Sequence, residues 1–415
     1  MPLAPYRAVL SVPGVLRLLL FGVLARVPQT AAGIVLSLHV VGPLGRGWAA
    51  AGRVGTAATV GMAIGSPWRG RAVDTQGLRR ALVPSVVASA LVWGTAPFVG
   101  YRLLLVLAVV GGVLSLPIFT VMRQSLAVMV PAESRRSAMA LDSVGVELSF
   151  MAGPALGVLL ATQLSTSAAI LSVGGCIVVS GLALIAFDPP TRSADGVAAD
   201  AAEAVAAREQ EAAGGSAPAG VPGRSRGRLT SPAMLAVLGA TAAATVVLAG
   251  TDVSVVAHLR ADGALALTGL IFAAWGIGSI LGGLVYGTLH RPVSPLLLLL
   301  GLGVLSIPVG LAPSPWFLAL TMLPAAALCA PVITSTSEAI VRLVPEAVRG
   351  EAMGWHASAL QVGSAIGAPL AGVAIDADGA WAGFAAVGAA GVVLALAGLG
   401  VLRLRRSRAA ALVPA

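Results

Sequence analysis

The chain is organised as long apolar runs separated by short polar gaps. A transmembrane helix needs about 20 consecutive apolar residues, and the chain offers about twelve runs of that order. The runs cover residues 14–40, 48–68, 82–99, 103–129, 138–161, 166–187, 232–258, 265–288, 294–312, 315–341, 352–375 and 380–402. The pattern therefore predicts an all-α membrane protein with about twelve transmembrane helices.

One longer polar segment divides the runs into two equal sets. Residues 188–231 are rich in Ala, Gly, Ser and Pro and carry mixed charge, a composition that cannot bury a core. We therefore predict three parts. Residues 1–187 form an N-terminal six-helix bundle, residues 188–231 a flexible cytoplasmic linker, and residues 232–415 a C-terminal six-helix bundle with a basic tail.

The two halves repeat each other. Residues 117–139, at the end of the fourth run and in the next gap, align with residues 331–353 at a constant offset of 331 − 117 = 214. The register persists through a polar gap, which chance similarity between apolar helices does not explain. Parallel repeats of this kind occur in transporters, so the expected fold is two pseudo-symmetric bundles. The identities are Pro117/Pro331, Thr120/Thr334, Val130/Val344, Pro131/Pro345, Arg135/Arg349, Ala138/Ala352 and Met139/Met353.

Composition agrees with a chain that lies in lipid. The 415 residues are 57% hydrophobic and 10% charged, whereas a soluble domain has about 25% charged residues. No lysine is present, so the chain has no P-loop lysine and is not an ATP-driven pump on its own. Cys176 and Cys329 lie inside apolar runs and form no disulfide or metal pattern. We expect no cofactor, no bound metal and no enzymatic activity.

The arginines indicate how the chain is oriented. Basic residues favour cytoplasmic gaps, so both termini and the linker are expected in the cytoplasm, and the protein in the inner membrane of a bacterium. Dispersal among gaps also argues against nucleic-acid binding. We expect the bilayer, a small molecule and protons as partners of a monomer. The arginine-rich gaps hold Arg7, Arg69, Arg71, Arg79, Arg80, Arg135, Arg136, the arginines of 192–228, Arg291, Arg349 and those of 403–408, and the other gaps hold Arg46, Arg53, Arg102 and Arg260.

The gap after the second run contains a distinctive loop, GRAVDTQGLRR, at residues 70–80. It resembles the signature loop of the major facilitator superfamily, G-x-x-x-D-R/K-x-G-R/K-R/K-R, although Thr75 and Leu78 depart from that pattern. The resemblance implies a cytoplasmic latch in which Asp74 faces a helix N-terminus or an arginine and glycines permit a tight turn. An ordinary basic loop is the alternative. The matching residues are Gly70, Asp74, Gly77, Arg79 and Arg80.

A degenerate copy of this loop follows the eighth run. It begins at Gly283, and Gly287 stands where the first copy has its aspartate. We therefore expect any latch in the second half to be weaker than that in the first.

The fifth run carries Gly153, Pro154 and Gly157 in the order G-P-x-x-G. This looks like the core of the antiporter signature (G-P-x-x-G-G) of drug exporters in the superfamily, with Val158 in place of the last glycine. The proline bends a helix and the small residues permit close packing, so plain helix packing is an equally good interpretation. The eleventh run echoes the motif with Gly367, Pro369 and Gly372.

Charged residues inside the runs are the best candidates for function, because each costs roughly 2.5–3.5 kcal/mol at mid-membrane. Arg26 lies in the first run and Asp252 in the outer part of its pseudo-symmetric mate, and in the superfamily these two helices line the central cavity. The alternatives are a structural ion pair or snorkelling. Arg123 and Glu147 lie at similar depths in the fourth and fifth runs and are expected to pair, either as a proton carrier or as a static inner gate. Asp142 is shallower.

These observations together predict a secondary transporter that works by alternating access. Residues 141–154 resemble those of drug-exporter-like actinobacterial members of the superfamily, which favours an antiporter that exports a small organic, amphipathic compound in exchange for protons. Two alternatives stay open. One is uptake or facilitated diffusion of a polar metabolite such as a sugar or organic acid, and the other is a membrane sensor or scaffold without transport. Arg26 also allows an anionic substrate.

Overall fold

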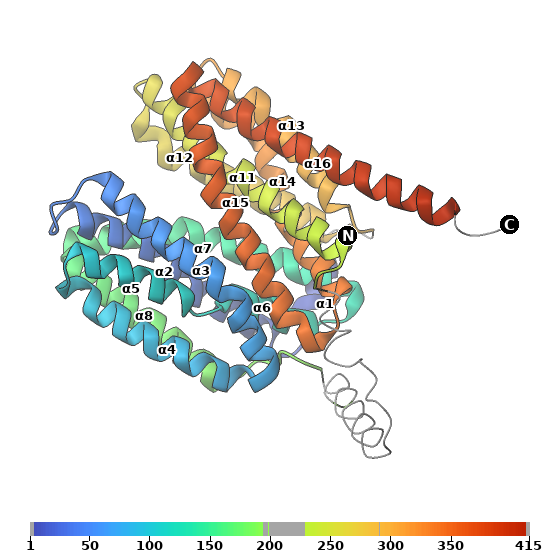
Figure 1. The fold of residues 1–415 in the computed structure, drawn as a ribbon, viewed down its shortest axis with the longest axis horizontal. Helices are drawn as coiled ribbons and strands as arrows, with labels where there is room; N and C mark the ends of the chain where they lie inside the picture. Colours follow the sequence, from blue (N-terminus) through green and yellow to red (C-terminus); the bar gives the residue numbers. More distant parts are fainter. Residues whose placement is uncertain (1–3, 194–197, 199–228, 290, 412–415) are drawn as a thin grey trace. The chain divides into compact units, whose positions relative to one another are not determined.

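The computed structural model describes residues 4–193, 198, 229–289 and 291–411, and Figure 1 traces them from blue at the N-terminus to red at the C-terminus. The helices of the first half are α1 (Ala4–Leu10), α2 (Val15–Val41), α3 (Trp48–Gln76), α4 (Leu78–Thr95), α5 (Tyr101–Val113), α6 (Ile118–Met129), α7 (Arg135–Gln163) and α8 (Thr166–Phe187). Those of the second half are α11 (Pro232–Ala261), α12 (Thr268–Gly287), α13 (Pro295–Ser306), α14 (Pro315–Leu343), α15 (Arg349–Asp378) and α16 (Ala380–Ala411).

The predicted spans correspond to these helices. Within the described residues, ten helices are long and apolar enough to cross a membrane, and a shorter apolar helix covers Pro295–Leu311. The remaining predicted span, 48–68, lies in α3, whose glycines and charged residues lower its hydropathy. The fold is therefore an all-α membrane protein with about twelve spans. Most of the predicted linker, residues 194–197 and 199–228, lies outside the described residues.

Each half has a hydrophobic core of its own. One core is built from buried residues between Val9 and Leu184 and the other from residues between Ala240 and Ala395. The chain forms two compact units, residues 1–235 with 340–358, and residues 236–339 with 359–415. The end of α14 and the start of α15 thus belong to the same unit as the first six spans. The domain boundaries at 187 and 232 stay a prediction.

Small residues bring neighbouring helices close together in both units. In the first unit, a Cβ added at Gly61 or Gly65 of α3 would overlap backbone atoms of α5. In the second unit, a Cβ at Gly282 of α12 would overlap the carbonyl of Ala327 in α14. Lipid supplies no hydrophobic force between helices, so close backbone packing is a main source of their association.

The fourth span is not one continuous helix. Residues 114–117 separate α5 from α6, and Pro117 stands directly before α6. A proline has no N–H to donate and its ring displaces the preceding turn, so carbonyls before it lose their helical partners. Irregular backbone at membrane depth is tolerated where neighbouring groups satisfy it, and the residues that do so are described below.

Candidate functional site

Asp74 lies near the end of α3, where α3 meets the first turn of α15. Its Oδ1 accepts a hydrogen bond from the backbone N–H of Gly350 at 2.9 Å, and its Oδ2 accepts one from Glu351 at 2.8 Å. The first amides of a helix have no partner within the helix, and the helix dipole favours an anion beside them. The Nε2 of Gln124 also donates to Oδ1, at 3.2 Å. Asp74 therefore faces a helix N-terminus, the geometry that the signature loop implies.

The backbones of α3 and α15 touch at this point. A Cβ added at Gly70 would overlap the carbonyl of Gly350, and one at Gly354 would overlap the carbonyl of Ser66. The hydroxyl of Ser358 donates to the carbonyl of Ala63 at 2.5 Å. Small residues spaced four apart on both helices make such an approach possible. We call Ser66, Gly70, Asp74, Gly350 and Gly354 the α3–α15 junction, and all five belong to the first compact unit.

The rest of the signature loop surrounds the junction. Gly77 joins α3 to α4 with φ +80°, a backbone conformation that glycine adopts without strain. Arg79 forms an ion pair with Asp188 at 2.8 Å, but the two side chains are 62% and 39% exposed, so the pair contributes little stability. Arg80 is exposed. Gly70 and Asp74 therefore form the contact with α15, while the two arginines lie on the surface.

Burial changes the acidity of Asp74, which lies six residues beyond the predicted span 48–68 (74 − 68 = 6). Desolvation raises the pKa of its carboxyl group from 3.8 to about 7, and the hydrogen bonds from Glu351, Gly350 and Gln124 oppose that rise. A group with this pKa changes its charge near neutral pH.

A second polar cluster lies inside the first unit, where α2, α6 and α7 meet. Asp142 of α7 pairs with two arginines at once. Its Oδ1 contacts Arg26 Nη2 of α2 at 2.7 Å and its Oδ2 contacts Arg123 Nε of α6 at 3.2 Å. Arg26 and Asp142 are each 1% exposed. The guanidinium of Arg26 also lies 5.0 Å from the centre of the Phe119 ring, within the range of a cation–π interaction. We call Arg26, Arg123 and Asp142 the buried charge cluster.

From the sequence, Arg26 and Arg123 are identified as candidates, but Glu147 and not Asp142 is proposed as the carboxylate that pairs with Arg123. Asp142 was expected to lie shallower than Arg123, yet it is the shared partner of Arg123 and Arg26. The sequence feature that could have pointed to Asp142 is its position as a charged residue inside a transmembrane run. Glu147 lies half-buried on the same helix, and its pairing with Arg123 stays a prediction.

Two further polar residues, which sequence reasoning did not single out as site residues, stabilise the break in the fourth span. Arg69 of α3 donates from Nη1 to the carbonyl and the hydroxyl of Ser115. Gln29 of α2 donates from Nε2 to the carbonyl of Leu116 at 3.1 Å. Arg69 is 4% exposed. These side chains replace the helical partners that residues 114–117 lack.

The proline and glycine motif of the fifth span packs against the first span. A Cβ at Gly153 would overlap the hydroxyl of Thr30, and one at Gly157 would press on Ile34 and Val35. The Thr30 hydroxyl donates to the carbonyl of Ser149 at 2.7 Å. Pro154 lies within α7, which continues past it. These residues hold α7 against α2, the two helices that carry Asp142 and Arg26.

The echo of this motif in α15 is only partly packed. A Cβ at Gly367 would overlap the carbonyl of Val246 in α11, whereas one at Gly372 would meet no heavy atom within 4 Å. Pro369 lies within α15. Close packing therefore requires a glycine at 367, and the structure gives no such reason for Gly372.

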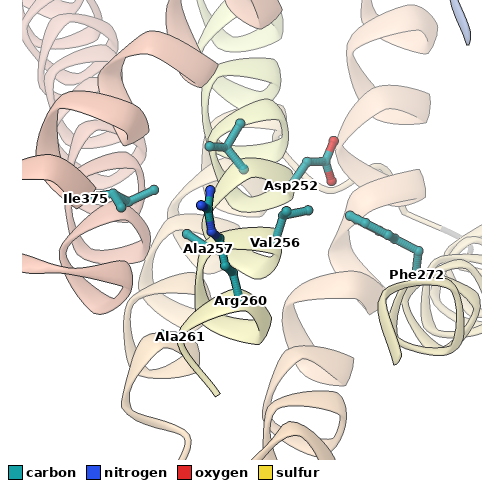
Figure 2. A pocket seen from close by; sticks show the side chains of 8 residues that line it. Asp252, Val256, Ala257, Arg260, Ala261, Phe272 and Ile375 are labelled. Carbon is teal, nitrogen blue, oxygen red and sulfur yellow. The ribbon is translucent and has the colours of Figure 1, made fainter. Parts of the chain in front are cut away.

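In the second unit, Asp252 lines a pocket of about 780 Å³. Figure 2 shows Asp252 and Arg260 on α11, with Phe272 of α12 and Ile375 of α15 approaching from either side. Both charged residues are exposed. The volume lies within the range of pockets that hold drug-sized ligands. The remaining lining is apolar: Val253, Val256, Ala257, Ala261, Phe272 and Ile375.

Comparison with known proteins identifies the family. The sequence pattern of the Major Facilitator Superfamily matches residues 18–302, more than half of the chain. The chain belongs to the major facilitator superfamily. It is thus a membrane protein of a family of transporters that bind small molecules. No curated protein sequence matches it significantly.

Solved structures of the superfamily share its fold. The human organic anion transporter MFSD10 (TETRAN) superposes with a TM-score of 0.66 at 17% identity, covering 95% of this chain and 99% of that protein. The proton:xylose symporter XylE gives 0.66 at 15% identity, with 94% and 95% covered. A bacterial homologue of the iron transporter ferroportin, in an outward-facing state, gives 0.68 at 14% identity, with 93% and 98% covered. At these identities the likeness concerns the fold alone.

Proposed function

We propose that this protein is a proton-coupled antiporter that exports a small organic, amphipathic compound across the inner membrane of a bacterium, with both termini in the cytoplasm. It resembles the drug-exporter-like members of the superfamily and works as a monomer by alternating access. The observation that carries the proposal is the buried charge cluster, in which Asp142 holds Arg26 and Arg123 together.

The cluster provides a charged contact that a transport cycle can break. Two cations inside a bundle are tolerated because they share a carboxylate. Loss of the attraction between Asp142 and the two arginines during the transport cycle would weaken the contact between α2, α6 and α7 in one step. Glu147, one and a half turns further along α7, is the carboxylate that we propose for the proton pathway. Removing one member of a buried pair typically costs about 3–5 kcal/mol, so the packing of these three helices depends strongly on this one carboxylate.

The pocket in the second unit supports the amphipathic substrate class. Its lining is apolar except for Asp252 and Arg260, so it offers contact area to a hydrophobic body and charge to a polar group. The α3–α15 junction supports alternating access, because it fastens the start of α15 to the signature loop through a few contacts that a conformational change can break.

A susceptibility panel of toxic compounds in an efflux-deficient host tests the export proposal. The intact protein is expected to raise tolerance to at least one compound, and Asp142→Asn, Glu147→Gln and Asp252→Asn are expected to lose that tolerance at matched membrane abundance. Asp378→Asn, an exposed carboxylate at the end of α15, is the control. Addition of the same compound should also release protons from acidified vesicles that contain the intact protein. Vesicles that contain Asp142→Asn should release none. Unchanged tolerance with every compound and variant would remove the support for export.

A second candidate function is transport of an organic anion. The Nε of Arg26 is buried and has no hydrogen-bond partner among the described residues, so this donor could bind an anionic group that reaches it when the helices separate during the cycle. Binding of a fluorescent carboxylate or sulfonate that depends on Arg26, and survives Asp142→Asn, would favour this candidate. Uptake of a polar metabolite predicts instead counter-flow of a labelled sugar without a pH gradient.

A non-transporting sensor or scaffold makes the opposite prediction to all of these. Substitution of the junction and of the charge cluster would then leave every transport assay unchanged, and only the association of the protein with its partners would respond.

A further inference from the structure

The first residues after α8 contact the turn that precedes α15, next to the α3–α15 junction. Asp188 ends α8 in the left-handed conformation, with φ 42°, and two prolines follow it in the sequence. The prolines restrict the backbone, so the chain leaves α8 in a defined direction. We call residues 188–193 the strap. Residues 188–193 and the residues they contact all belong to the first compact unit.

The strap is fastened to the turn that begins α15. The backbone N–H and the hydroxyl of Ser193 both donate to Glu346 Oε2, each at 2.8 Å. Arg192 Nη2 donates to the carbonyl of Ala347 at 3.3 Å. The other oxygen of Glu346 pairs with Arg349 Nη1 at 3.3 Å. Hydrogen bonds to a charged acceptor are stronger than neutral ones, so Glu346 is the centre of this contact.

The strap is also joined to Asp74 through one side chain. Gln124 Nε2 lies 3.2 Å from Asp74 Oδ1 and 3.3 Å from the carbonyl of Thr191. Gln124 is 1% exposed. The same amide group therefore contacts both the residue that caps α15 and the segment that holds the turn before it.

We propose that the strap is a second fastening of the start of α15, in addition to the cap that Asp74 provides. Asp74 holds the first amides of α15 and Ser193 holds Glu346, three residues before the helix. The proposal concerns a conformational step and does not depend on the transported compound.

The exposure of the junction tests this proposal without a transport assay. Cys176 and Cys329 are replaced by alanine, and Glu351→Cys reports on the junction, because its backbone N–H bonds Asp74 whatever its side chain. The rate of maleimide labelling is measured in permeabilised membrane vesicles that contain the full chain. We expect Glu346→Gln to raise the rate about tenfold, since it weakens hydrogen bonds to a charged group. Glu133→Gln, in the corresponding turn before α7, is the matched control.

Substitutions of Ser193 distinguish the contribution of the strap from that of the ion pair between Glu346 and Arg349. Ser193→Pro removes both donors to Glu346 and leaves Arg349 in place, and it should raise labelling about fivefold or more. Ser193→Ala removes one donor and should have a smaller effect. If Ser193→Pro labels like the parent while Glu346→Gln labels fast, Glu346 acts through Arg349 alone and the strap proposal is wrong. Parent-like rates for both variants would overturn it as well.

Discussion

The two halves of the chain place an equivalent proline in different backbones. Pro117 follows a break in the fourth span, whereas its repeat mate Pro331 lies inside the continuous helix α14. The helix preceding Pro117 contains Gly111 and Gly112, where α14 has Ala325 and Ala326, and alanine is the better helix former by about 1 kcal/mol per residue. The proline alone therefore does not decide whether the helix breaks.

The neighbouring helix accounts for the remaining difference. Arg69 of α3 and Gly282 of α12 occupy equivalent positions at an offset of 282 − 69 = 213. Arg69 donates to the freed groups of Ser115, whereas Gly282 lets α12 lie directly on the carbonyl of Ala327. A hydrogen-bond donor on the neighbouring helix permits a break at membrane depth. Where the neighbouring helix packs closely and offers no such donor, the helix stays continuous. At the same offset Asp74 corresponds to Gly287, so only the first half has a carboxylate there.

Removal of Arg69 should have the largest effect. Arg69→Met leaves the Ser115 carbonyl without its donor inside the protein, and we expect it to lower the free energy of unfolding by about 3 kcal/mol. Denaturant unfolding of the protein in bilayer discs measures this value. Arg71→Met is the control, because Arg71 is exposed on the same helix. Equal stability of the two variants would show that the break needs no donor from α3.

At the equivalent position in the second half, Gly282, a larger side chain should lower the stability of the protein. Gly282→Ala adds a Cβ where the backbone of α14 lies, and we expect a loss of about 1–3 kcal/mol in the same unfolding experiment. Gly269→Ala on the same helix has open space around the added atom and should be neutral or slightly stabilising. A Gly282→Ala variant as stable as Gly269→Ala would mean that α12 and α14 are not held at this distance.

The comparison also shows how far sequence could predict the fold. Hydropathy predicted the spans because a backbone in lipid has to satisfy its own hydrogen bonds, which leaves the helix as the regular solution for an apolar run. The break before Pro117 was not predicted. Pro117 and Pro331 are identical in the repeat, and the difference depends on Arg69, a residue of another helix that served only as an indicator of orientation.

The candidate site shows the same limit. The geometry at Asp74 could be predicted because the signature loop is local in sequence and its mechanism requires a helix N-terminus. The buried charge cluster joins residues 116 positions apart. Run boundaries give the depth of a side chain only to within a few residues, and this was too coarse to identify Asp142 as the shared partner of two arginines.

Removal of the Asp74 carboxylate, which the second half lacks, should destabilise the α3–α15 junction. Asp74→Ala leaves two amides of α15 without their acceptor, and loss of a cap and its dipole interaction costs about 1–2 kcal/mol. We expect the labelling rate of the Glu351→Cys reporter to rise about five- to thirtyfold. Asp378→Ala removes an exposed carboxylate at the other end of α15 and should leave the rate unchanged. A rate for Asp74→Ala within twofold of the parent would show that the glycines hold the junction alone.

The smallest effect should be the dependence of the junction on pH between pH 8 and pH 7. Burial raises the pKa of Asp74 to about 7 in the packed junction, above the value of 3.8 that it has in water. The packed state therefore binds the proton more tightly than the released state, and packing is favoured as the pH falls from about 8 toward 4. Between pH 8 and pH 7 the gain is about twofold in the equilibrium constant. Thiol reactivity itself changes with pH, so the measured quantity is the labelling rate of Glu351→Cys divided by that of the same reporter with Asp74→Ala. A ratio that rises with falling pH would contradict the sign, and a constant ratio would show that Asp74 keeps its charge in the junction.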